Sequence, residues 1–190
     1  MGFPRSNDRL NRRALIARAS LLAAACLTLP FAHGVRADGG DDGSDEETVT
    51  VPIPRNVRPG QHWADVNLTQ QVAVAMNGAE IERVILVTSG MPGWDTPTGQ
   101  FRILYRVADE RMTSGALGIP IDSVDGYDLD HVLYTQYFTN QGHALHDNYW
   151  RPLSVFGHEA TSHGCVGMVE PDAEFLWNWT GNGSLVNIHE

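Results

Sequence analysis

The chain has 190 residues, a length that allows one domain and a leader but not two full domains. Hydrophobic residues make up 42% of it, which is enough for a core, and all 13 of its basic residues are arginine. Six of these lie at or before Arg36, so residues 38–190 carry 22 acidic residues against seven arginines, a net charge of −15. This charge disfavours nucleic acid and anionic lipid as partners.

Residues 1–37 have the pattern of an export signal. A basic segment with the pair Arg12-Arg13 precedes an apolar run, and the short residues ending at Ala37 suit cleavage by a signal peptidase. The run is too short and interrupted for a stable membrane span of about 20 residues. We therefore predict an exported protein of the periplasm, cell envelope or extracellular space, and the arginine pair is a weak indication of the twin-arginine route. Lipidation at Cys26 is the less favoured alternative.

Residues 38–62 are predicted to be a flexible linker. Their first ten residues, DGGDDGSDEE, are acidic and contain no apolar residue, and three prolines then stiffen the approach to the domain. The folded domain is expected over residues 63–190.

The pattern over residues 63–190 predicts a mainly β domain, because it contains many short apolar runs separated by turn residues. Asn77-Gly78 predicts a hairpin turn whose two central residues both have positive φ. Pro171–Trp179 is the single predicted helix, since proline suits a first turn and Gly181 follows the last one. Strands are predicted at 66–68, 72–76, 80–89, 100–107, 132–138, 144–145 and 184–188, with an irregular excursion over 108–126.

The chemistry of the chain points to one stretch, residues 142–168. Of the two cysteines, Cys26 lies in the predicted leader, so the mature chain holds one thiol and no internal disulfide. Cys165 ends the sequence SHGC, and His146 lies sixteen residues before the first residue of that sequence. A thiol needs a base to become a nucleophile, and a developing oxyanion needs backbone N–H donors. The stretch therefore favours a cysteine acyl-transfer site over an inert buried cysteine.

Two motifs resemble those of the L,D-transpeptidases of the YkuD type. SHGCV at 162–166, with His146 upstream, is similar to their active-site motif, and TPTGQF at 96–101 is similar to their TPTGxF stretch. The resemblance runs from about Trp63 to Ile188. It implies an L,D-transpeptidase-like β-sandwich or barrel of mixed sheets, with one short C-terminal helix and the cysteine in a cleft under a mobile lid.

The resemblance implies an activity on peptidoglycan stem peptides. The family attacks the peptide bond after the third residue of a stem tetrapeptide, which implies a thioester at Cys165 and release of the terminal D-alanine. Transfer to an amine on a second stem then gives a 3→3 cross-link, without ATP or another cofactor, and carbapenems are expected to acylate the same thiol. An L,D-carboxypeptidase using water as acceptor, or a catalytically silent wall- or metal-binding domain, are the alternatives.

The resemblance also assigns roles to individual residues. Cys165 is the expected nucleophile, His146 the general base, and His163 the residue that orients the nucleophile. Backbone N–H groups of residues 163–165 are expected to form the oxyanion hole, and Gly164 avoids a Cβ that would obstruct the turn. Ser162 supplies the supporting hydroxyl of the motif, and similar enzymes have an aromatic wall where Trp150 and Tyr149 lie, with plain core packing as the alternative. Two further expected contacts follow from position in the sequence and not from the resemblance. Arg151 is the nearest cation, with an ordinary surface arginine as the alternative, and Tyr137 is assigned with Tyr134 to the lid.

A metal site is not expected. Histidine nitrogen and thiolate suit zinc, so His143 and His146 with His163 and Cys165 are a conceivable ligand set. If 143–146 is a strand, however, His143 and His146 point to opposite faces.

Two positions depart from the family pattern. Gly167 stands where the family usually has Arg or Asn, so a side chain that would hold the catalytic turn or face the substrate is missing. Asp147 follows His146 where Gly or Ser is common. A backbone carbonyl that orients His146 would make this change harmless, whereas a carboxylate in the cleft would raise the basicity of the histidine or repel an acidic substrate.

Overall fold

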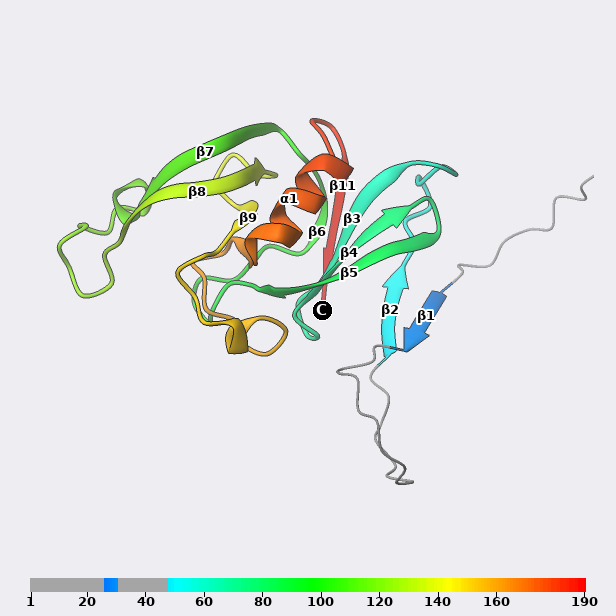
Figure 1. The fold of residues 1–190 in the computed structure, drawn as a ribbon, viewed down its shortest axis with the longest axis horizontal. Coiled ribbons are helices and arrows are strands. Elements are labelled where there is room, and N and C mark those ends of the chain that lie inside the picture. The colour runs from blue at the N-terminus through cyan, green and yellow to red at the C-terminus, as the bar shows by residue number, and fades with distance from the viewer. Residues whose placement is uncertain (1–25, 31–47) are drawn as a thin grey trace, which may run out of the picture.

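A computed structural model describes residues 26–30 and 48–190 of the chain (Figure 1). The predicted export signal lies outside the described residues except for Cys26–Pro30, and the acidic half of the predicted linker, 38–47, lies entirely outside them. No helix in the described ranges is long and apolar enough to cross a membrane.

Nine strands build one curled, mixed sheet. Their bounds are β3 (His62–Asn67), β4 (Val72–Asn77), β5 (Glu80–Thr88), β6 (Gly99–Arg102), β7 (Tyr105–Thr113), β8 (Asp128–Tyr137), β9 (Ala144–Asp147), β10 (Val166–Met168) and β11 (Leu185–His189). The order is β6-β11-β3-β4-β5-β10-β9-β8-β7. The β11–β3 and β10–β9 pairs are parallel and the others antiparallel. β1 (Cys26–Pro30) pairs only with β2 (Thr48–Pro52). The predicted mainly β fold is confirmed.

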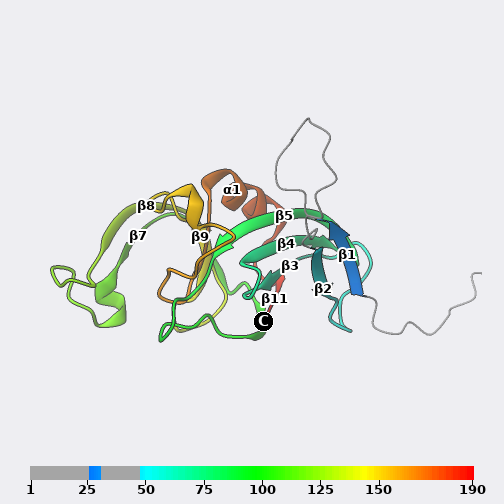
Figure 2. The ribbon, with the colours of Figure 1, turned by 90° about the horizontal axis from the view of Figure 1, so that it is seen from below.

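The helix α1 (Glu170–Trp179) covers one face of the sheet and closes the main core (Figures 1 and 2). Ala173 and Leu176 of α1 are buried with the apolar side chains of that face. Because side chains alternate along a strand, Ala73 and Ala75 of β4 face this core while Val74 and Met76 face a second cluster behind the sheet.

The second cluster corrects the predicted linker. Val49 and Val51 of β2 are 3% and 0% exposed and pack with Trp63 and Met76. Residues from Thr48 onward therefore belong to the folded domain, and only 38–47 remain as a predicted linker. The sequence TVTVP is too short for its alternation to stand out beside an acidic run and several prolines.

The predicted hairpin forms, but its turn differs from the prediction. Asn77 pairs with Glu80, so Gly78 and Ala79 are the two turn residues. Only Gly78 has a positive φ, +60°. A turn with positive φ at its first central residue alone needs one glycine rather than an Asn-Gly pair.

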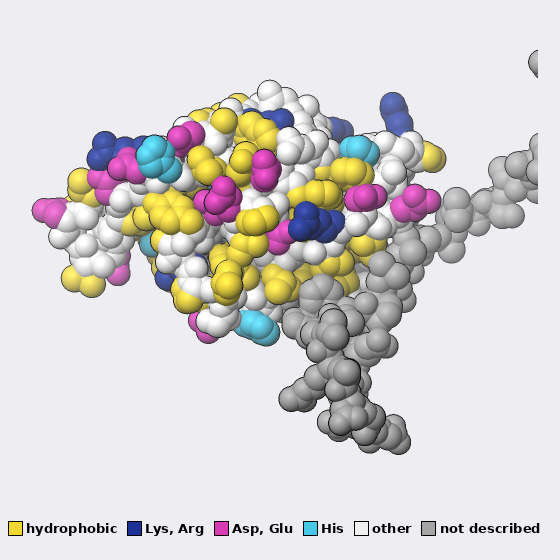
Figure 3. All heavy atoms as spheres, viewed as in Figure 1, with side chains coloured by type: hydrophobic (Ala, Val, Ile, Leu, Met, Phe, Trp, Pro, Cys, Tyr) yellow, Lys and Arg dark blue, Asp and Glu magenta, His cyan; other side chains and the backbone are white. Residues whose placement is uncertain are grey.

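A long hairpin replaces most of the irregular excursion predicted over 108–126. β7 runs on to Thr113, the 3-10 helix Ser114–Leu117 and a loop follow, and β8 begins at Asp128. No residue of β7 is buried, so the strand shows no apolar alternation in its sequence. The hairpin β7–β8 projects away from the rest of the sheet (Figures 1 and 2), and at this end basic and acidic side chains lie side by side on the surface (Figure 3).

Candidate active site

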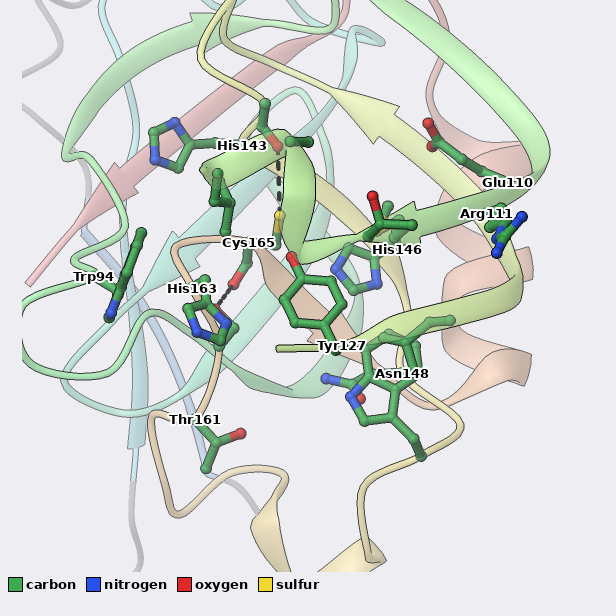
Figure 4. Close-up of a pocket in the computed structure, with 18 of the residues that line it drawn as sticks. Trp94, Glu110, Arg111, Tyr127, His143, His146, Asn148, Thr161, His163 and Cys165 are labelled. Atoms are coloured by element: carbon green, nitrogen blue, oxygen red, sulfur yellow. Dashed lines mark hydrogen bonds between the residues drawn. The ribbon is translucent and has the colours of Figure 1, made fainter. Parts of the chain in front are cut away.

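The register of two parallel strands brings Cys165 and His146 to the same face of the sheet. Gly167 of β10 lies opposite His146 of β9, and Val166 lies opposite Leu145. Cys165 precedes Gly167 by two residues and therefore shares its face, which is also the face of His146. Both side chains line one cavity of about 920 Å³ (Figure 4).

The thiol of Cys165 is neutral at rest. Its Sγ donates to the carbonyl oxygen of Gly142 at 3.5 Å. Burial raises the pKa of this thiol to about 11; the backbone N–H of Ala144 lowers the pKa, and the carboxylate of Glu110 raises it. Since the thiolate is the nucleophilic form, a base must remove the proton as the reaction proceeds.

His146 is the candidate for that base, because it lines the same cavity as Cys165. The ring is buried and its Nδ1 lies 2.5 Å from the carbonyl oxygen of Asp147, so Nδ1 carries the proton. Nε2 is then the nitrogen that can accept one. Burial lowers the pKa of His146, and the bond to Asp147 partly offsets this effect. The histidine is therefore neutral near pH 7.

Asp147 acts on His146 through its backbone only. As the neighbour of His146 in β9, Asp147 points to the opposite face of the sheet, toward α1. Burial, and then Glu170, raise the pKa of its carboxyl group to about 6. Its Oδ1 has no hydrogen-bond partner among the described residues. Of the two arrangements considered for this position, the structure has the one in which the backbone carbonyl of Asp147 is bonded to His146.

Two side-chain hydroxyl groups form hydrogen bonds to the backbone of residues 162–165, which we call the catalytic turn. Ser162 Oγ donates to the carbonyl of Cys165 at 2.6 Å and accepts the N–H of Gly164 at 3.0 Å. Thr96, in the TPTG motif, accepts the N–H of Gly90 at 2.9 Å and donates to the carbonyl of Gly164 at 3.0 Å. The two sequence motifs thus meet in space at the catalytic turn, and Ser162 supports that turn from within.

Gly164 has a φ of +106°, which a residue with a side chain rarely adopts. A Cβ there would lie 2.7 Å from Cδ2 of His143. Glycine is therefore required on both grounds. The predicted oxyanion hole needs one correction, because the N–H of Gly164 is already bonded to Ser162. The N–H groups of His163 and Cys165 are the remaining candidate donors.

His143 lies in the same cavity as His146, not on the opposite face. The prediction that His143 and His146 point to opposite faces was wrong, because it assumed that residue 143 is in the strand, whereas β9 begins only at Ala144. The ring of His143 bonds to Thr139 Oγ1 at 2.8 Å and packs beside Gly164. Within residues 26–30 and 48–190, no three His, Cys, Asp or Glu side chains are grouped so that they could hold a metal ion.

Aromatic rings form the walls of the cavity. Trp150 stacks on His146 with ring centroids 5.8 Å apart, and His163 lies between Trp94 and Tyr127, at 4.8 and 5.4 Å. Burial, and then Arg151, lower the pKa of His163, so it is also neutral near pH 7.

The remaining predicted contact residues fall into two groups. Arg151 and Tyr137 line the cavity; Arg151 donates to the carbonyl of Thr161, and Tyr137 OH donates to Glu110. Tyr149 does not line it: its ring packs edge-on against Trp150 and its hydroxyl binds the carbonyl of Asp130. Tyr134 lies on the other face of β8, toward Trp177 of α1, and is not part of the cavity.

Comparison with known proteins decides the family. The family model for the L,D-transpeptidase catalytic domain, YkuD, matches residues 61–188. The chain belongs to this family. It is 35% identical over 107 residues to a probable L,D-transpeptidase 3 of Mycobacterium tuberculosis, and 28% identical over 125 residues to L,D-transpeptidase 2 of that organism. These alignments cover 56% and 66% of this chain but 39% and 30% of the relatives, so the chain spans less than half the length of either.

Solved structures agree with this assignment. The fold matches the crystal structure of L,D-transpeptidase 3 from Mycobacterium tuberculosis with a faropenem-derived adduct, with a TM-score of 0.64 and 27% identity over 68% of this chain and 60% of that one. An LD transpeptidase in complex with imipenem has the same fold, with a TM-score of 0.64 and 23% identity over 67% of this chain and 58% of that one.

The glycine that departs from the L,D-transpeptidase pattern is explained by a neighbour. A Cβ on Gly167 would lie 2.4 Å from Nδ2 of Asn148 and 2.9 Å from its Cβ. Asn148 follows His146 by two residues, so it shares the cavity face, and it is 2% exposed. The space where the family usually has a larger side chain is therefore filled by Asn148, the residue that follows β9.

Several cavity residues of this L,D-transpeptidase domain were missed from the sequence. Thr96 lies in the TPTGQF motif, to which the sequence alone assigned no role, and the spacing of two between His146 and Asn148 was the signal that could have identified Asn148. Glu110 and Tyr127 gave no signal, because the exposed hairpin that carries them has no periodic pattern. Trp94 lies in a loop rich in Gly and Pro, where nothing predicted its approach to His163.

Proposed function

We propose that this chain is a cysteine-dependent peptidoglycan L,D-transpeptidase that makes 3→3 cross-links. The observation that carries the proposal is the shared cavity of a neutral Cys165 thiol and a neutral His146 whose Nδ1 is fixed by a backbone carbonyl. Membership of the L,D-transpeptidase family supplies the substrate class.

In the first half-reaction, Nε2 of His146 takes the thiol proton while Sγ attacks the carbonyl carbon of the third residue of a stem tetrapeptide. The N–H groups of His163 and Cys165 stabilise the oxyanion of the tetrahedral intermediate. His146 then returns the proton to the nitrogen of the terminal D-alanine, the C–N bond breaks, and a thioester remains on Cys165.

In the second half-reaction, an amine of another stem attacks the thioester carbonyl. Its proton passes to His146, the C–S bond breaks, and the thiol is restored. Water in place of the amine gives a tripeptide, so transpeptidation and carboxypeptidation differ only in the acceptor.

The test is incubation of the described domain, from Thr48, with a disaccharide-tetrapeptide, followed by mass spectrometry. A dimer one D-alanine lighter than two monomers is expected with the parent chain and not with Cys165→Ala. A dimer formed equally by Cys165→Ala contradicts the proposal, and tripeptide without dimer assigns the chain as a carboxypeptidase.

Carbapenems are proposed to acylate Cys165, on the support of the related enzymes solved with imipenem and with a faropenem-derived adduct. Intact-mass measurement after incubation with imipenem should show one adduct on the parent chain and none on Cys165→Ala. An adduct on both would place the reaction at another residue.

Export to the cell envelope, directed by residues 1–37, also remains a proposal. N-terminal sequencing of the enzyme from the envelope fraction should begin at Asp38. A chain that keeps its first residues there would contradict cleavage.

A further inference from the structure

We propose that Glu110, together with Tyr105 and Tyr137, forms a subsite for a primary ammonium group of the stem peptide. The proposal rests on the proposed function, since it takes stem peptides as substrates. It names the chemical group that the hairpin side of the cavity recognises.

Glu110 has an unused hydrogen-bonding oxygen at the wall of the catalytic cavity. It lines the cavity that holds Cys165 (Figure 4), and its Oε1 accepts the hydroxyl of Tyr137 at 2.8 Å. Its Oε2 is shielded from solvent and has no partner among the described residues. A carboxylate oxygen shielded from water without a partner is costly. A cationic N–H donor bound against Glu110 would remove that cost once the carboxylate turns this oxygen toward the cavity.

The arginines that line the cavity do not neutralise Glu110. Arg111 binds Asp128 through two hydrogen bonds of 2.7 and 2.6 Å and also lies 3.5 Å from Asp130. Arg151 donates to the carbonyl of Thr161. Neither of these arginines forms an ion pair with Glu110, so its carboxylate can form one with a cationic ligand.

Aromatic rings extend the same wall. Tyr105 stacks on Tyr137 with ring centroids 4.5 Å apart, and Tyr105 is 47% exposed. Both rings line the cavity. An ammonium group is attracted to aromatic faces, and its three N–H bonds can reach a carboxylate at the same time. A carboxylate beside an exposed ring favours an alkylammonium over a neutral or anionic group.

The subsite is close enough to the nucleophile to act on one substrate with it. Glu110, Tyr105 and Tyr137 line the same cavity as Cys165, and the charge of Glu110 raises the pKa of that thiol. A cation bound at Glu110 would reduce that repulsion and favour the thiolate. The ammonium could belong to the third residue of the donor stem or to the acceptor stem, and the experiment separates these sources.

The experiment measures binding and turnover with two disaccharide-tetrapeptides, one with a free side-chain amine on its third residue and one with that amine acetylated. Binding is measured by calorimetry on the full chain carrying Cys165→Ala. The free-amine peptide is expected to bind about tenfold more tightly, as for a hydrogen bond between charged groups. Glu110→Gln should remove this preference.

Asp109→Asn is the matched control. It removes the same charge from the adjacent residue, which lies on the opposite face of β7, is bonded to His131 and does not line the cavity. This variant should keep the preference. Circular dichroism and melting curves verify that all variants fold.

Turnover in chains with Cys165 intact identifies the source of the amine. If the donor supplies it, Glu110→Gln raises KM for tripeptide formation. If the acceptor supplies it, Glu110→Gln lowers the ratio of dimer to tripeptide and leaves that KM unchanged. Equal binding of the two peptides to the Cys165→Ala chain, or a preference that survives Glu110→Gln, overturns the subsite. Absence of any Cys165-dependent product, with the binding preference intact, overturns the proposed function and leaves the subsite standing.

Discussion

The catalytic turn and the β7–β8 hairpin face each other across one cavity, but they are built differently. Around the turn, Ser162 and Thr96 use side-chain hydroxyls to bind backbone groups, and Val166 and Met168 of β10 are fully buried. The hairpin has no buried residue in β7, and at its tip Val124 is fully exposed. The turn carries the proposed nucleophile, Cys165, while the hairpin contributes Glu110 and Tyr127 to the cavity.

The difference in burial between the turn and the hairpin matches two different roles, positioning the reacting atoms and contacting the substrate. The reacting atoms need fixed positions, which buried hydrogen bonds and packed strands provide. A wall that contacts substrate can tolerate an exposed, locally paired hairpin, because regions with few buried contacts open at low cost. Changes at the turn should therefore alter both stability and kcat, and changes in the hairpin should alter KM with little effect on stability.

The largest effect is expected at the base. His146→Ala should lower kcat/KM for tetrapeptide consumption by about 10²- to 10⁴-fold, the usual contribution of a positioned proton acceptor. The proposed base must be neutral to accept a proton, and burial lowers the pKa of His146 below the ordinary 6.5. Activity should therefore persist above that lowered pKa and fall as pH drops through it. An acidic limb at pH 7 or above in the kcat/KM profile would contradict this assignment.

Thr96→Val tests the anchoring of the turn. It removes the bonds to Gly90 and Gly164, so stability should fall by about 2 kcal/mol and kcat by about 10- to 100-fold as the turn shifts. Thr113→Val is the control, because it removes a threonine hydroxyl from the hairpin side of the cavity. It should lower both stability and kcat by less than Thr96→Val does. Equal effects of the two variants, measured by chemical denaturation and steady-state kinetics, would erase the distinction between turn and hairpin.

Gly167→Ala tests the filling of the turn by Asn148. The added Cβ would meet that side chain, so the variant should lose about 1–3 kcal/mol, the usual cost of overpacking. In an Asn148→Ala background the same change should cost much less, and the double-mutant cycle gives the coupling energy. Gly115→Ala in the hairpin, where a Cβ would have its nearest neighbour at 3.6 Å, is the control. Additive effects at 148 and 167 would show that the two side chains do not compete for space.

Asp147→Asn tests the charge behind the catalytic strand. Burial raises the pKa of this carboxyl group from 3.8 to about 6, so the folded state binds its proton more tightly than the unfolded state. Stability from this group is present at low pH and is lost as pH rises through about 6. The amide should therefore stabilise the enzyme by about 1–3 kcal/mol at pH 7. Melting curves should converge near pH 4; a constant difference at all pH values would point to packing instead.

Tyr127→Phe tests the hairpin and should have the smallest effect. The ring of Tyr127 packs on His163 and its hydroxyl faces Cys165 (Figure 4). Loss of the hydroxyl should change the rate of imipenem acylation by less than about tenfold, as for one neutral hydrogen bond. The melting temperature should stay unchanged. A large drop in melting temperature would mean that the hairpin is as integral to the fold as the turn.

The amino-acid sequence was sufficient for the mainly β fold, the family, and the candidates for nucleophile and base. These follow from short segments: SHGC and TPTG are contiguous, and the hairpin at Gly78 and the helix near Pro171 depend on neighbouring residues. The predicted start of the domain and the predicted end of the strand at 100–107 were wrong, because these two boundaries depend on packing against distant residues. β2 is held by a cluster that includes Trp63, and β7 by its pairing with β8.

The tertiary structure alone decided how the site is assembled. The parallel register of β9 and β10, strands about twenty residues apart in the chain, places Cys165 with His146 and turns Asp147 away. The same register lets Asn148 fill the space at Gly167. Curling of the sheet brings the hairpin and Glu110 to the cavity. Registers and face-to-face contacts are set by the packing of the whole domain, and no single segment of the sequence encodes them.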